Sequence, residues 1–321
     1  AAIEKKELEL WQQGKRISLE LLKNMLTTQE NNSSFISFFK QEVTNSSLKN
    51  STKRNHLSTL MLLQEFKKDI TFSDLTFEFV SSFEYFLQLK GYHTNTIAKH
   101  MKHLKRHVNI AINKEYIEIQ KYAFRKYKIK TVENKHTHLV PEELEKLEKL
   151  NLSGRYMKLQ KSLDAFLFCC YAGMRYSDFT NLSSENIVDI NQETWLIYKS
   201  VKTGTEVRLP LYLLFAGKGI IILNKYRDNL EGFFRLRDNS NVNKDLLTLA
   251  KLAGLSKNIS FHTARHTNAT LLIYNGVNIT TVQKLLGHKS VKTTQVYTNI
   301  MDMTIIHDLE KMKQATPFAG K

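Results

Sequence analysis

Residues 261–297 read FHTARHTNATLLIYNGVNITTVQKLLGHKSVKTTQVY and decide how the rest of the chain is interpreted. The stretch places His262 three residues before Arg265, a second histidine at His288 after an apolar segment, and a tyrosine at its end, Tyr297. Each of these residues alone is ordinary. Together they supply cations, proton-transfer groups and one nucleophile within a short module, a combination that suits phosphate chemistry.

Helical geometry predicts how these side chains are grouped. Residues three apart share a helical face, so His262 and Arg265 should lie together, where the arginine can clamp a phosphate and the histidine can move protons. His266 falls on a neighbouring face and is interpreted as structural. His288 is expected on a turn before a short helix that carries Tyr297, the candidate nucleophile. Nearby cations favour the phenolate form of such a tyrosine.

Two further cations are candidates upstream. Arg175 follows a buried apolar helix, and a bidentate guanidinium fits the charge that develops on the oxygens of a phosphodiester. Lys202 lies at the tip of a predicted hairpin between the β-prone runs 195–201 and 206–211. A flexible ammonium group at a hairpin tip suits donation of a proton to a departing alkoxide.

Four motifs resemble the signature of the tyrosine recombinase (integrase) family. His262-Thr-Ala-Arg265-His-Thr resembles its H-x-x-R box, and Leu285-Leu-Gly-His288-Lys-Ser-x-x-Thr-Thr-x-x-Tyr297 resembles its second box. Ala172-Gly-Met-Arg175-Tyr-Ser-Asp resembles the first arginine box, and Val201-Lys202-Thr-Gly resembles the lysine hairpin. All four occur in the family's order. Ala264 and Asn268 stand where bulkier apolar residues are common in the family, a departure that affects packing more than chemistry.

The resemblance implies a catalytic set of Arg175, Lys202, His262, Arg265, His288 and Tyr297. Tyr297 would attack the scissile phosphate and leave a 3′-phosphotyrosyl link and a free 5′-hydroxyl. The two arginines and His288 would bind the phosphate oxygens, Lys202 would protonate the leaving oxygen, and His262 would assist proton transfer or orient the phosphate. No cofactor, ATP or metal is implied, and the sequence has no Gly-rich phosphate loop or Cys/His set with metal-site spacing.

The predicted fold class is mainly α with a small antiparallel β-sheet (α+β). It comprises an N-terminal four-helix core-binding domain and a C-terminal tyrosine-recombinase catalytic domain, and a chain of 321 residues suits two domains. The predicted divisions are a connector or arm-binding remnant at 1–33, a helical core-site DNA-binding domain at 34–120, a basic linker at 121–138, the catalytic domain at 139–300 and a tail at 301–321. The first 30 residues are too short for the arm-site-binding domain of many integrase-type relatives, which is either absent or outside this sequence.

Apolar periodicity and capping residues give the expected helices. In the first domain they are residues 35–44, 51–68, 74–90 and 94–113, with N-caps at Ser34, at Asn50 or Ser51, at Ser73 and at Thr94. In the second domain a helix should open at Pro141, a buried helix at 162–171 should end at Gly173 with Ser177 or Asp178 capping the next, and further helices are expected at 243–254, 263–275 and 278–286.

The charge points to nucleic acid as the partner. The formal net charge is +16, and residues 91–135 supply +8 of it through eleven Lys/Arg against three Glu. On the fourth helix the basic residues recur at three- and four-residue steps with His100, His103 and His107 interleaved, so one face can lie along a phosphate backbone. The alternative is a solvated, solubilising face. The DNA-binding candidates are Lys99, Lys102, Lys105, Arg106, Lys121, Arg125, Lys126 and Lys128.

The predicted partners are double-stranded DNA, which the two domains clamp, and further copies of this chain. An apolar stripe in the tail either packs on its own domain or, as the resemblance suggests, docks on a neighbouring protomer in a tetramer on paired DNA sites. The stripe is formed by Ile305, Ile306, Leu309 and Met312. DNA-bending accessory proteins are a further expected partner. The adjacent Cys169 and Cys170 suit a reducing cytoplasm, with the protein on the nucleoid, and no apolar run reaches the length of a membrane span.

Several outcomes fit the same chemistry. Resemblance to integrases of mobile elements favours integration and excision, with DNA inversion or dimer resolution as alternatives. A type IB topoisomerase shares the chemistry but does not join two specific sites. A DNA-binding protein without activity and a metal-dependent nuclease are further interpretations, and the complete catalytic set argues against the first of these.

Overall fold

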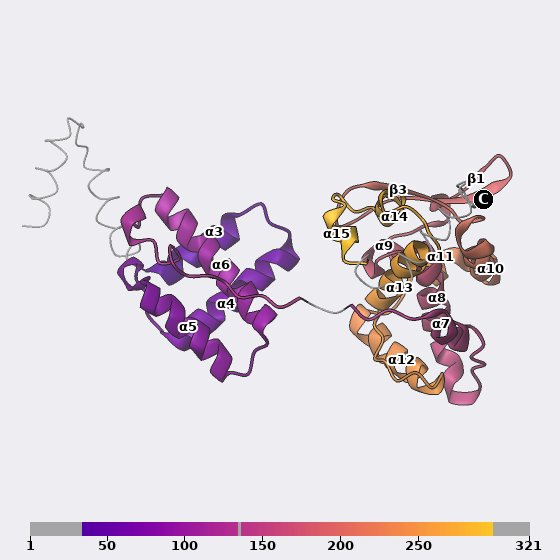
Figure 1. Ribbon diagram of the computed structural model, residues 1–321, viewed down its shortest axis with the longest axis horizontal. Coiled ribbons are helices and arrows are strands. Elements are labelled where there is room, and N and C mark those ends of the chain that lie inside the picture. The colour runs from indigo at the N-terminus through magenta and orange to yellow at the C-terminus, as the bar shows by residue number, and fades with distance from the viewer. Residues whose placement is uncertain (1–33, 134–135, 298–321) are drawn as a thin grey trace, which may run out of the picture. The chain divides into compact units, whose positions relative to one another are not determined.

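The computed structural model describes residues 34–133 and 136–297. The chain divides into two compact units, residues 1–134 and 135–321, and each is described by itself (Figure 1). The described residues are mainly helical and contain one three-stranded antiparallel sheet, so the predicted fold class is confirmed. None of the described helices is long and apolar enough to cross a membrane. The predictions for the connector at 1–33 and for the tail stripe fall outside the described residues.

The described part of the N-terminal unit is built on four α-helices, and aromatic residues fill its centre. Its described helices are α3 (Phe35–Asn45), α4 (Asn50–Phe66), α5 (Phe77–Leu89) and α6 (Thr94–Asn113). Phe35, Phe39 and Phe83 are completely buried. Burying a phenylalanine side chain contributes about 1.5–3 kcal/mol relative to leaving it exposed. The helical spacing of these aromatic residues therefore both specifies the helices and assembles them.

Only one of the four predicted N-caps of this unit is correct. The Ser34 side chain accepts a hydrogen bond from the Ser37 backbone, as predicted for α3. Thr76 caps α5 through a 3.2 Å bond from the Phe79 amide, because a short 3₁₀ turn occupies the preceding residues. The caps predicted at Asn50 or Ser51, at Ser73 and at Thr94 are wrong. Helices α4 and α6 instead begin after Lys49 and His93, which make no side-chain cap bond.

The histidines predicted for the basic stripe of α6 lie on its inner face. His100 and His107 are 3% and 2% exposed. The Thr59 hydroxyl oxygen lies 2.8 Å from Nδ1 of His100 and 2.8 Å from Nδ1 of His103, and the His107 ring stacks on Phe39 with centroids 3.6 Å apart. Their assignment to the stripe is therefore wrong, because their three- and four-residue spacing matches the α6 positions that pack inside the unit.

Burial of these imidazoles should make the N-terminal unit sensitive to acid. Burial, with a smaller effect of neighbouring positive charge, lowers the pKa of His100 to about 4 and that of His103 to about 3. An unfolded chain titrates its histidines near pH ~6.5, so the unfolded state binds more protons between about pH 6.5 and about pH 4. The free energy of unfolding should therefore fall as the pH is lowered through this window, by roughly 2–5 kcal/mol.

Hydrogen exchange of the α4 and α6 peptides in the full chain, corrected for intrinsic rates, measures this loss. His107→Asn removes one buried titrating ring and should make the pH dependence shallower. His93→Asn is the matched control, because His93 is exposed at the start of the same helix and should leave the pH dependence unchanged. An unaltered profile in His107→Asn would contradict the prediction.

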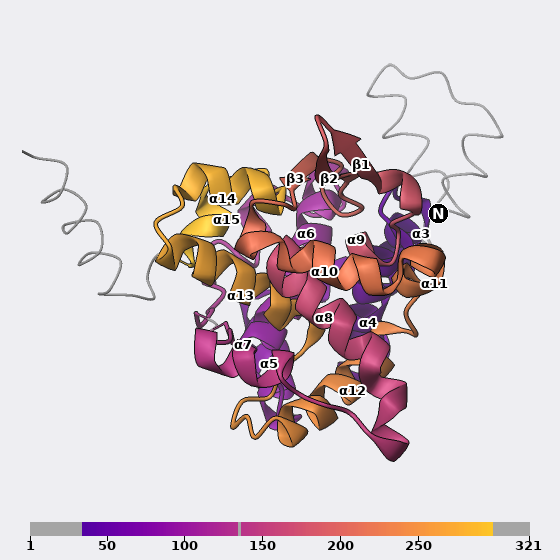
Figure 2. The ribbon, with the colours of Figure 1, turned by 90° about the vertical axis from the view of Figure 1, so that its right-hand side faces the viewer.

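The C-terminal unit is organised around the buried helix α8. The described helices of this unit are α7 (Pro141–Glu148), α8 (Gln160–Ala172), α9 (Tyr176–Phe179), α10 (Lys218–Lys225), α11 (Leu230–Phe234), α12 (Asn239–Leu252), α13 (Phe261–Tyr274), α14 (Ile279–Leu286) and α15 (Lys292–Gln295). Every α8 residue from Ser162 to Ala172 is buried, and α8 packs against α13, α10 and α12. Figure 2 shows α8 crossing this unit with α10 and α13 beside it. The prediction of a central apolar helix is confirmed.

The sheet of this unit presents the hairpin at one edge. Its antiparallel strands are ordered β1 (Ile187–Ile190), β2 (Glu193–Lys199) and β3 (Glu206–Pro210). The predicted hairpin between β2 and β3 is confirmed, whereas β1, α10 and α11 were not predicted. Helix α14 packs against β3, as the two views show (Figures 1 and 2). This contact brings the second box of the opening stretch to the hairpin.

Helix ends in the C-terminal unit follow backbone chemistry. Pro141 begins α7 as predicted, and Gly173 ends α8 with φ +67°, a conformation that favours glycine. A Cβ at Gly173 would also lie 2.6 Å from the Asn268 side-chain oxygen, so the position is sterically closed as well. The prediction that Ser177 or Asp178 caps the next helix is wrong. Arg175 is the N-cap residue of α9 and makes no side-chain cap bond, whereas Asp178 lies inside α9 and accepts a hydrogen bond from the Val201 amide.

Candidate active site

The buried carboxylate of Asp178 joins Arg175 to the hairpin. The Arg175 side chain is 13% exposed, and its Nη1 lies 3.4 Å from Asp178 Oδ2 and 3.2 Å from the Ser200 hydroxyl oxygen. The Val201 amide and the Ser200 hydroxyl also donate to Asp178, the amide at 2.9 Å. One carboxylate thus fixes both a candidate phosphate-binding guanidinium and the start of the turn that carries Lys202. The sequence named Asp178 only as a possible helix cap and missed this position.

Lys202 lies in the exposed turn between β2 and β3. The turn is closed by bonds from the Ser200 amide to the Thr205 carbonyl oxygen at 2.9 Å and from the Gly204 amide to the Ser200 carbonyl oxygen at 2.7 Å. Gly204 has φ +68°, which lets the chain reverse. These bonds fix the backbone of the turn, and Lys202 is exposed on it. The structure therefore places Lys202 at the hairpin tip that the sequence predicted.

Arg265 is buried and joins three parts of the fold. It is 1% exposed, its Nη1 donates to the Gly173 carbonyl oxygen at 2.7 Å, and its Nη2 donates to the Leu286 carbonyl oxygen at 2.6 Å. Those carbonyls close the C-terminal ends of α8 and α14, where a positive charge is favourable. Burial and the charge of Arg175 lower the pKa of Arg265 to about 10, so it stays protonated at neutral pH. The sequence predicted a phosphate clamp and did not predict this second, structural function.

His262 and His288 both lie in the field of these cations. His262 lies on the first turn of α13 and is exposed as a whole residue, but partial removal of its ring from water, followed by the charges of Arg265 and Arg175, lowers its pKa to about 4. His288 is buried beyond the end of α14, with Nδ1 2.9 Å from the Thr294 hydroxyl oxygen. Burial and the same two arginines lower its pKa to about 3. Both rings are therefore neutral at physiological pH.

Tyr297 is buried, and its hydroxyl contacts His266. The side chain is 5% exposed, and its hydroxyl oxygen lies 2.9 Å from His266 Nδ1. Burial raises the pKa of Tyr297, while the charges of Arg265 and Arg175 act in the opposite direction. The prediction that a short helix carries Tyr297 is wrong, because α15 ends at Gln295 and the tyrosine lies in the following turn. The interpretation of His266 as structural did not foresee this contact.

The six predicted catalytic residues form one electrostatic group. Arg175, Arg265 and Lys202 each lower the pKa of His262 and of His288. The two arginines also act on the Tyr297 hydroxyl. Four separate segments of the chain, namely the start of α9, the hairpin, α13 and the region after α14, therefore supply one concentrated positive site beside a tyrosine. Such a site can bind a phosphodiester and stabilise the charge of its transition state. Among the residues that the structure describes, no His, Cys, Asp and Glu cluster has the arrangement of a metal site.

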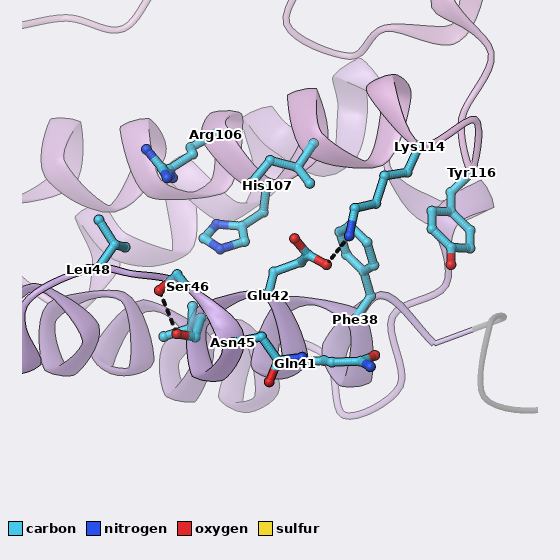
Figure 3. Close-up of a pocket in the computed structure, with 12 residues that line it drawn as sticks. Phe38, Gln41, Glu42, Asn45, Ser46, Leu48, Arg106, His107, Lys114 and Tyr116 are labelled. Carbon is cyan, nitrogen blue, oxygen red and sulfur yellow. Dashed lines mark hydrogen bonds and ion pairs between the residues drawn. The ribbon is translucent and has the colours of Figure 1, made fainter.

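The predicted DNA-binding residues are placed on the surface of the N-terminal unit. All eight are exposed except Lys105, which is half-buried with Nζ 5.9 Å from the centre of the Phe124 ring. Lys121 is paired with Glu118 at 3.0 Å, an exposed contact of little energetic weight. Figure 3 shows Arg106 beside His107 at a pocket of about 420 Å³ between α3 and α6, where Glu42 pairs with Lys114. The basic side chains are thus available to a polyanion.

For the phosphodiester chemistry that the sequence predicts, Asp178→Asn should slow cleavage by roughly 10–100-fold while leaving binding of DNA intact. The amide keeps the size of the carboxylate but removes the charge that holds Arg175 and offers one acceptor oxygen where two were used. The rate of covalent complex formation in a single turnover measures the effect. Asp189→Asn, an exposed change on β1 of the same sheet, is the control and should have no effect. Equal rates in both variants would contradict the coupling.

Two family models match this arrangement. The phage integrase family matches residues 138–303, and the phage integrase SAM-like domain matches residues 34–129. The chain belongs to the phage integrase family. The match to residues 138–303 includes all four motifs identified in the sequence. The resemblance inferred from the four motifs is confirmed.

Named relatives of this family member are recombinases. It is 31% identical over 185 residues to a tyrosine recombinase of Pseudothermotoga lettingae, which covers 55% of this chain and 60% of that protein. The chain therefore aligns with less than two thirds of the length of this relative. It is 26% identical over 271 residues to the tyrosine recombinase XerD of Oceanobacillus iheyensis, covering 78% of this chain and 86% of that protein.

Solved structures share the fold. A lambda integrase dimer bound to a COC' core site matches with a TM-score of 0.68 and 19% identity, covering 82% of this chain and 93% of that one. The Tn1549 transposon integrase in complex with a circular intermediate DNA matches with a TM-score of 0.68 and 15% identity, covering 87% and 99%. At these low sequence identities the similarity shows that the fold is shared and shows nothing further about this chain.

Proposed function

We propose that this chain is a site-specific DNA recombinase that cleaves and rejoins DNA strands through a 3′-phosphotyrosyl intermediate. The observation that carries the proposal is the grouping of two arginines and a lysine around His262 and His288, with the Tyr297 hydroxyl in the field of the same arginines. A phosphodiester carries its negative charge on two non-bridging oxygens, and its transition state carries more. Fixed guanidinium groups in a partly dry site stabilise that added charge.

The roles follow from position. Tyr297 supplies the attacking oxygen, and the new bond to phosphorus preserves the energy of the broken phosphodiester, so rejoining requires no ATP. Arg175 and Arg265 bind the phosphate oxygens together with His288. Lys202, on an exposed tip, can follow the leaving 5′-oxygen and protonate it. This scheme requires no metal ion or cofactor.

Integration and excision of a mobile element is the proposed biological outcome. Lambda integrase and the Tn1549 transposon integrase share the fold over most of this chain. Dimer resolution is the second candidate, because XerD of Oceanobacillus iheyensis aligns over 86% of its length. DNA inversion uses the same chemistry. Product analysis on paired sites in direct and inverted orientation, on one molecule and on two, distinguishes these outcomes.

The proposed partners are double-stranded DNA and three further copies of this chain. A lambda integrase tetramer bound to a Holliday junction is among the structures with the same fold. Exposed lysines and arginines of α6 and of the following segment are proposed to contact phosphates, so DNA affinity should fall steeply with salt. The compartment proposed is the cytoplasm, on the nucleoid, and DNA-bending proteins are proposed accessory factors.

A pool of nicked duplexes with a randomised segment tests the function even before the DNA site is identified. A nick just 3′ of the cleaved phosphate releases a short fragment and prevents rejoining, so a cleaving enzyme is trapped on its DNA. We expect complexes that survive SDS, retain a 5′ label and contain an enriched sequence. The absence of any trapped complex across the pool would overturn the proposal. Trapping that requires a divalent metal and is lost in EDTA would favour a metal-dependent nuclease.

A type IB topoisomerase predicts a different result on plasmids. Rapid relaxation of a supercoiled plasmid that lacks the enriched sequence would favour that alternative. A recombinase should instead act only where the sequence occurs, and should produce joined products when two copies are present. A protein without activity would bind the same sequence and trap nothing.

Lys202→Ala should slow covalent complex formation by roughly 10²–10⁴-fold, because the leaving 5′-oxygen then departs without a proton. A substrate whose bridging 5′-oxygen is replaced by sulfur should restore the rate, since a thiolate is stable without protonation. Lys199→Ala is the control, because Lys199 is exposed on the same hairpin. Failure of the sulfur substrate to rescue Lys202→Ala would contradict its role as the acid.

A further inference from the structure

The Tyr297 hydroxyl is held by a histidine outside the six predicted catalytic residues. Its oxygen lies 2.9 Å from Nδ1 of His266, and both side chains are buried at 5% and 7% exposure. The His266 ring stacks on His136 with centroids 4.4 Å apart and an interplanar angle of 23°. His262 meets the same ring edge-on, with centroids 4.5 Å apart and an angle of 81°. The imidazole that contacts the nucleophile is thus fixed from two sides.

We propose that His266 is a catalytic residue that takes the hydroxyl proton of Tyr297 when the tyrosine attacks phosphorus and returns it when the strands are rejoined. This inference rests on the proposed recombinase function and adds the base that the six-residue set leaves open. In the step, the Oη–H electrons stay on oxygen, the proton moves to Nδ1, and a lone pair of Oη forms the bond to phosphorus. The bond from phosphorus to the 5′-oxygen breaks, and that oxygen takes a proton from Lys202.

Geometry favours His266 over His262 for this task. A general base must lie within hydrogen-bond reach of the proton that it removes, and the His266 contact to Tyr297 meets that requirement. His262 is exposed on the first turn of α13, toward Arg265, Arg175 and Lys202. Within the described residues, His262 contacts the ring of His266, and the hydrogen bond with the Tyr297 hydroxyl is made by His266. His262 is therefore placed to act on the phosphate side of the site.

The surroundings keep the His266 ring in its neutral form. Burial, His262, His136, Arg265 and His138 together lower its pKa to about 3, so the ring is neutral before DNA binds. A neutral ring with its proton on Nε2 presents a lone pair at Nδ1 to the tyrosine. A bound phosphodiester brings negative charge into the site and raises the basicity of the ring. An imidazolium in this cationic pocket is easily deprotonated, which suits return of the proton during rejoining.

The test compares substitutions at His266 in the full chain on the nicked substrate that traps the covalent complex. His266→Asn keeps an acceptor oxygen near the position of Nδ1 but has no basic nitrogen. It can therefore still accept a hydrogen bond from the Tyr297 hydroxyl but cannot take its proton. We expect covalent complex formation to slow by roughly 10²–10⁴-fold in His266→Asn with DNA binding retained. His266→Ala should be equally slow and should recover with added imidazole, increasingly as the pH rises through the pKa of imidazole. Pyrrole, which has the same ring size and no basic nitrogen, should not restore it.

Several outcomes overturn the inference. A rate in His266→Asn equal to that of the unchanged protein shows that no proton passes to this residue. Rescue of His266→Ala by pyrrole as well as by imidazole shows that the ring only fills space. Faster cleavage in His266→Phe shows that the hydrogen bond restrains the tyrosine instead of activating it. If the variants no longer fold, as circular dichroism and thermal unfolding would show, His266→Gln repeats the comparison with a longer neutral side chain.

The inference and the proposed function fail in different ways. If the unchanged protein forms no trapped complex on any substrate, the recombinase function is wrong. If it forms the complex and His266→Asn does so at the same rate, the function stands and the role of His266 alone is rejected. The substrate with a bridging sulfur gives a further separation. This substrate should restore the rate of Lys202→Ala and leave His266→Asn slow. Its leaving thiolate needs no proton from Lys202, whereas Tyr297 must still lose its proton to His266.

Discussion

Tyr297→Phe is expected to bind DNA as the unchanged protein does and to form no complex that survives SDS. Phenylalanine keeps the ring that packs in the site and removes the hydroxyl oxygen proposed to bond to phosphorus. The lost hydrogen bond to His266 should cost about 1 kcal/mol of stability, too little to unfold the unit. The expected loss of activity is therefore complete, and it is chemical in origin.

Tyr198→Phe is the matched control for this change. Tyr198 is also buried, lies within the field of Arg265 and Arg175, and has a hydroxyl with no hydrogen-bond partner in the described structure. Removing that hydroxyl should leave trapping unchanged. If Tyr297→Phe still forms the trapped complex, the nucleophile is another residue. If only Tyr198→Phe loses the trapped complex, Tyr198 is that residue.

The sequence predicted the local structure around several candidate site residues because each motif carries its own local geometry. His262 and Arg265 share a face wherever that segment is helical, and Gly173 ends α8 in the left-handed conformation just before Arg175. The hairpin was readable from two β-prone runs around Lys202. These features depend on neighbours within a few residues, so periodicity and turn chemistry are sufficient to find them.

Contacts between distant segments could not be predicted in the same way. Asp178 reads locally as a helix cap, but the hairpin 23 residues later offers it the Val201 amide. His266 reads as a structural neighbour of Arg265, and its partner Tyr297 is 31 residues away. The histidines of α6 read as part of a basic stripe because a pattern of three- and four-residue steps fits either face of a helix. Which face is buried is decided by Thr59 and Phe39 on other helices.

Arg265 shows how the structure and the chemistry of the site depend on each other. Its two terminal nitrogens hold the ends of α8 and α14, and these helices precede Arg175 and His288. The guanidinium thus fixes its neighbours, and its remaining N–H donors are the ones proposed to bind a phosphate. A change at this position should therefore affect both the stability and the rate, and the two effects must be measured separately.

Arg265→Lys is expected to slow covalent complex formation by at least about 10²-fold, equivalent to about 2.7 kcal/mol of transition-state stabilisation. Lysine keeps the charge but cannot reach both the Gly173 and the Leu286 carbonyl oxygens, which lie on different helix ends. One buried acceptor is then left unsatisfied, at a cost of about 1–3 kcal/mol of stability. Rates are measured well below the midpoint of thermal unfolding, with DNA binding followed in parallel. Arg208→Lys, on the exposed side of β3, is the control and should change neither quantity. A folded Arg265→Lys protein that cleaves at the normal rate would show that a positive charge at this position is sufficient. The two hydrogen bonds from the guanidinium to the Gly173 and Leu286 carbonyl oxygens would then have no part in catalysis.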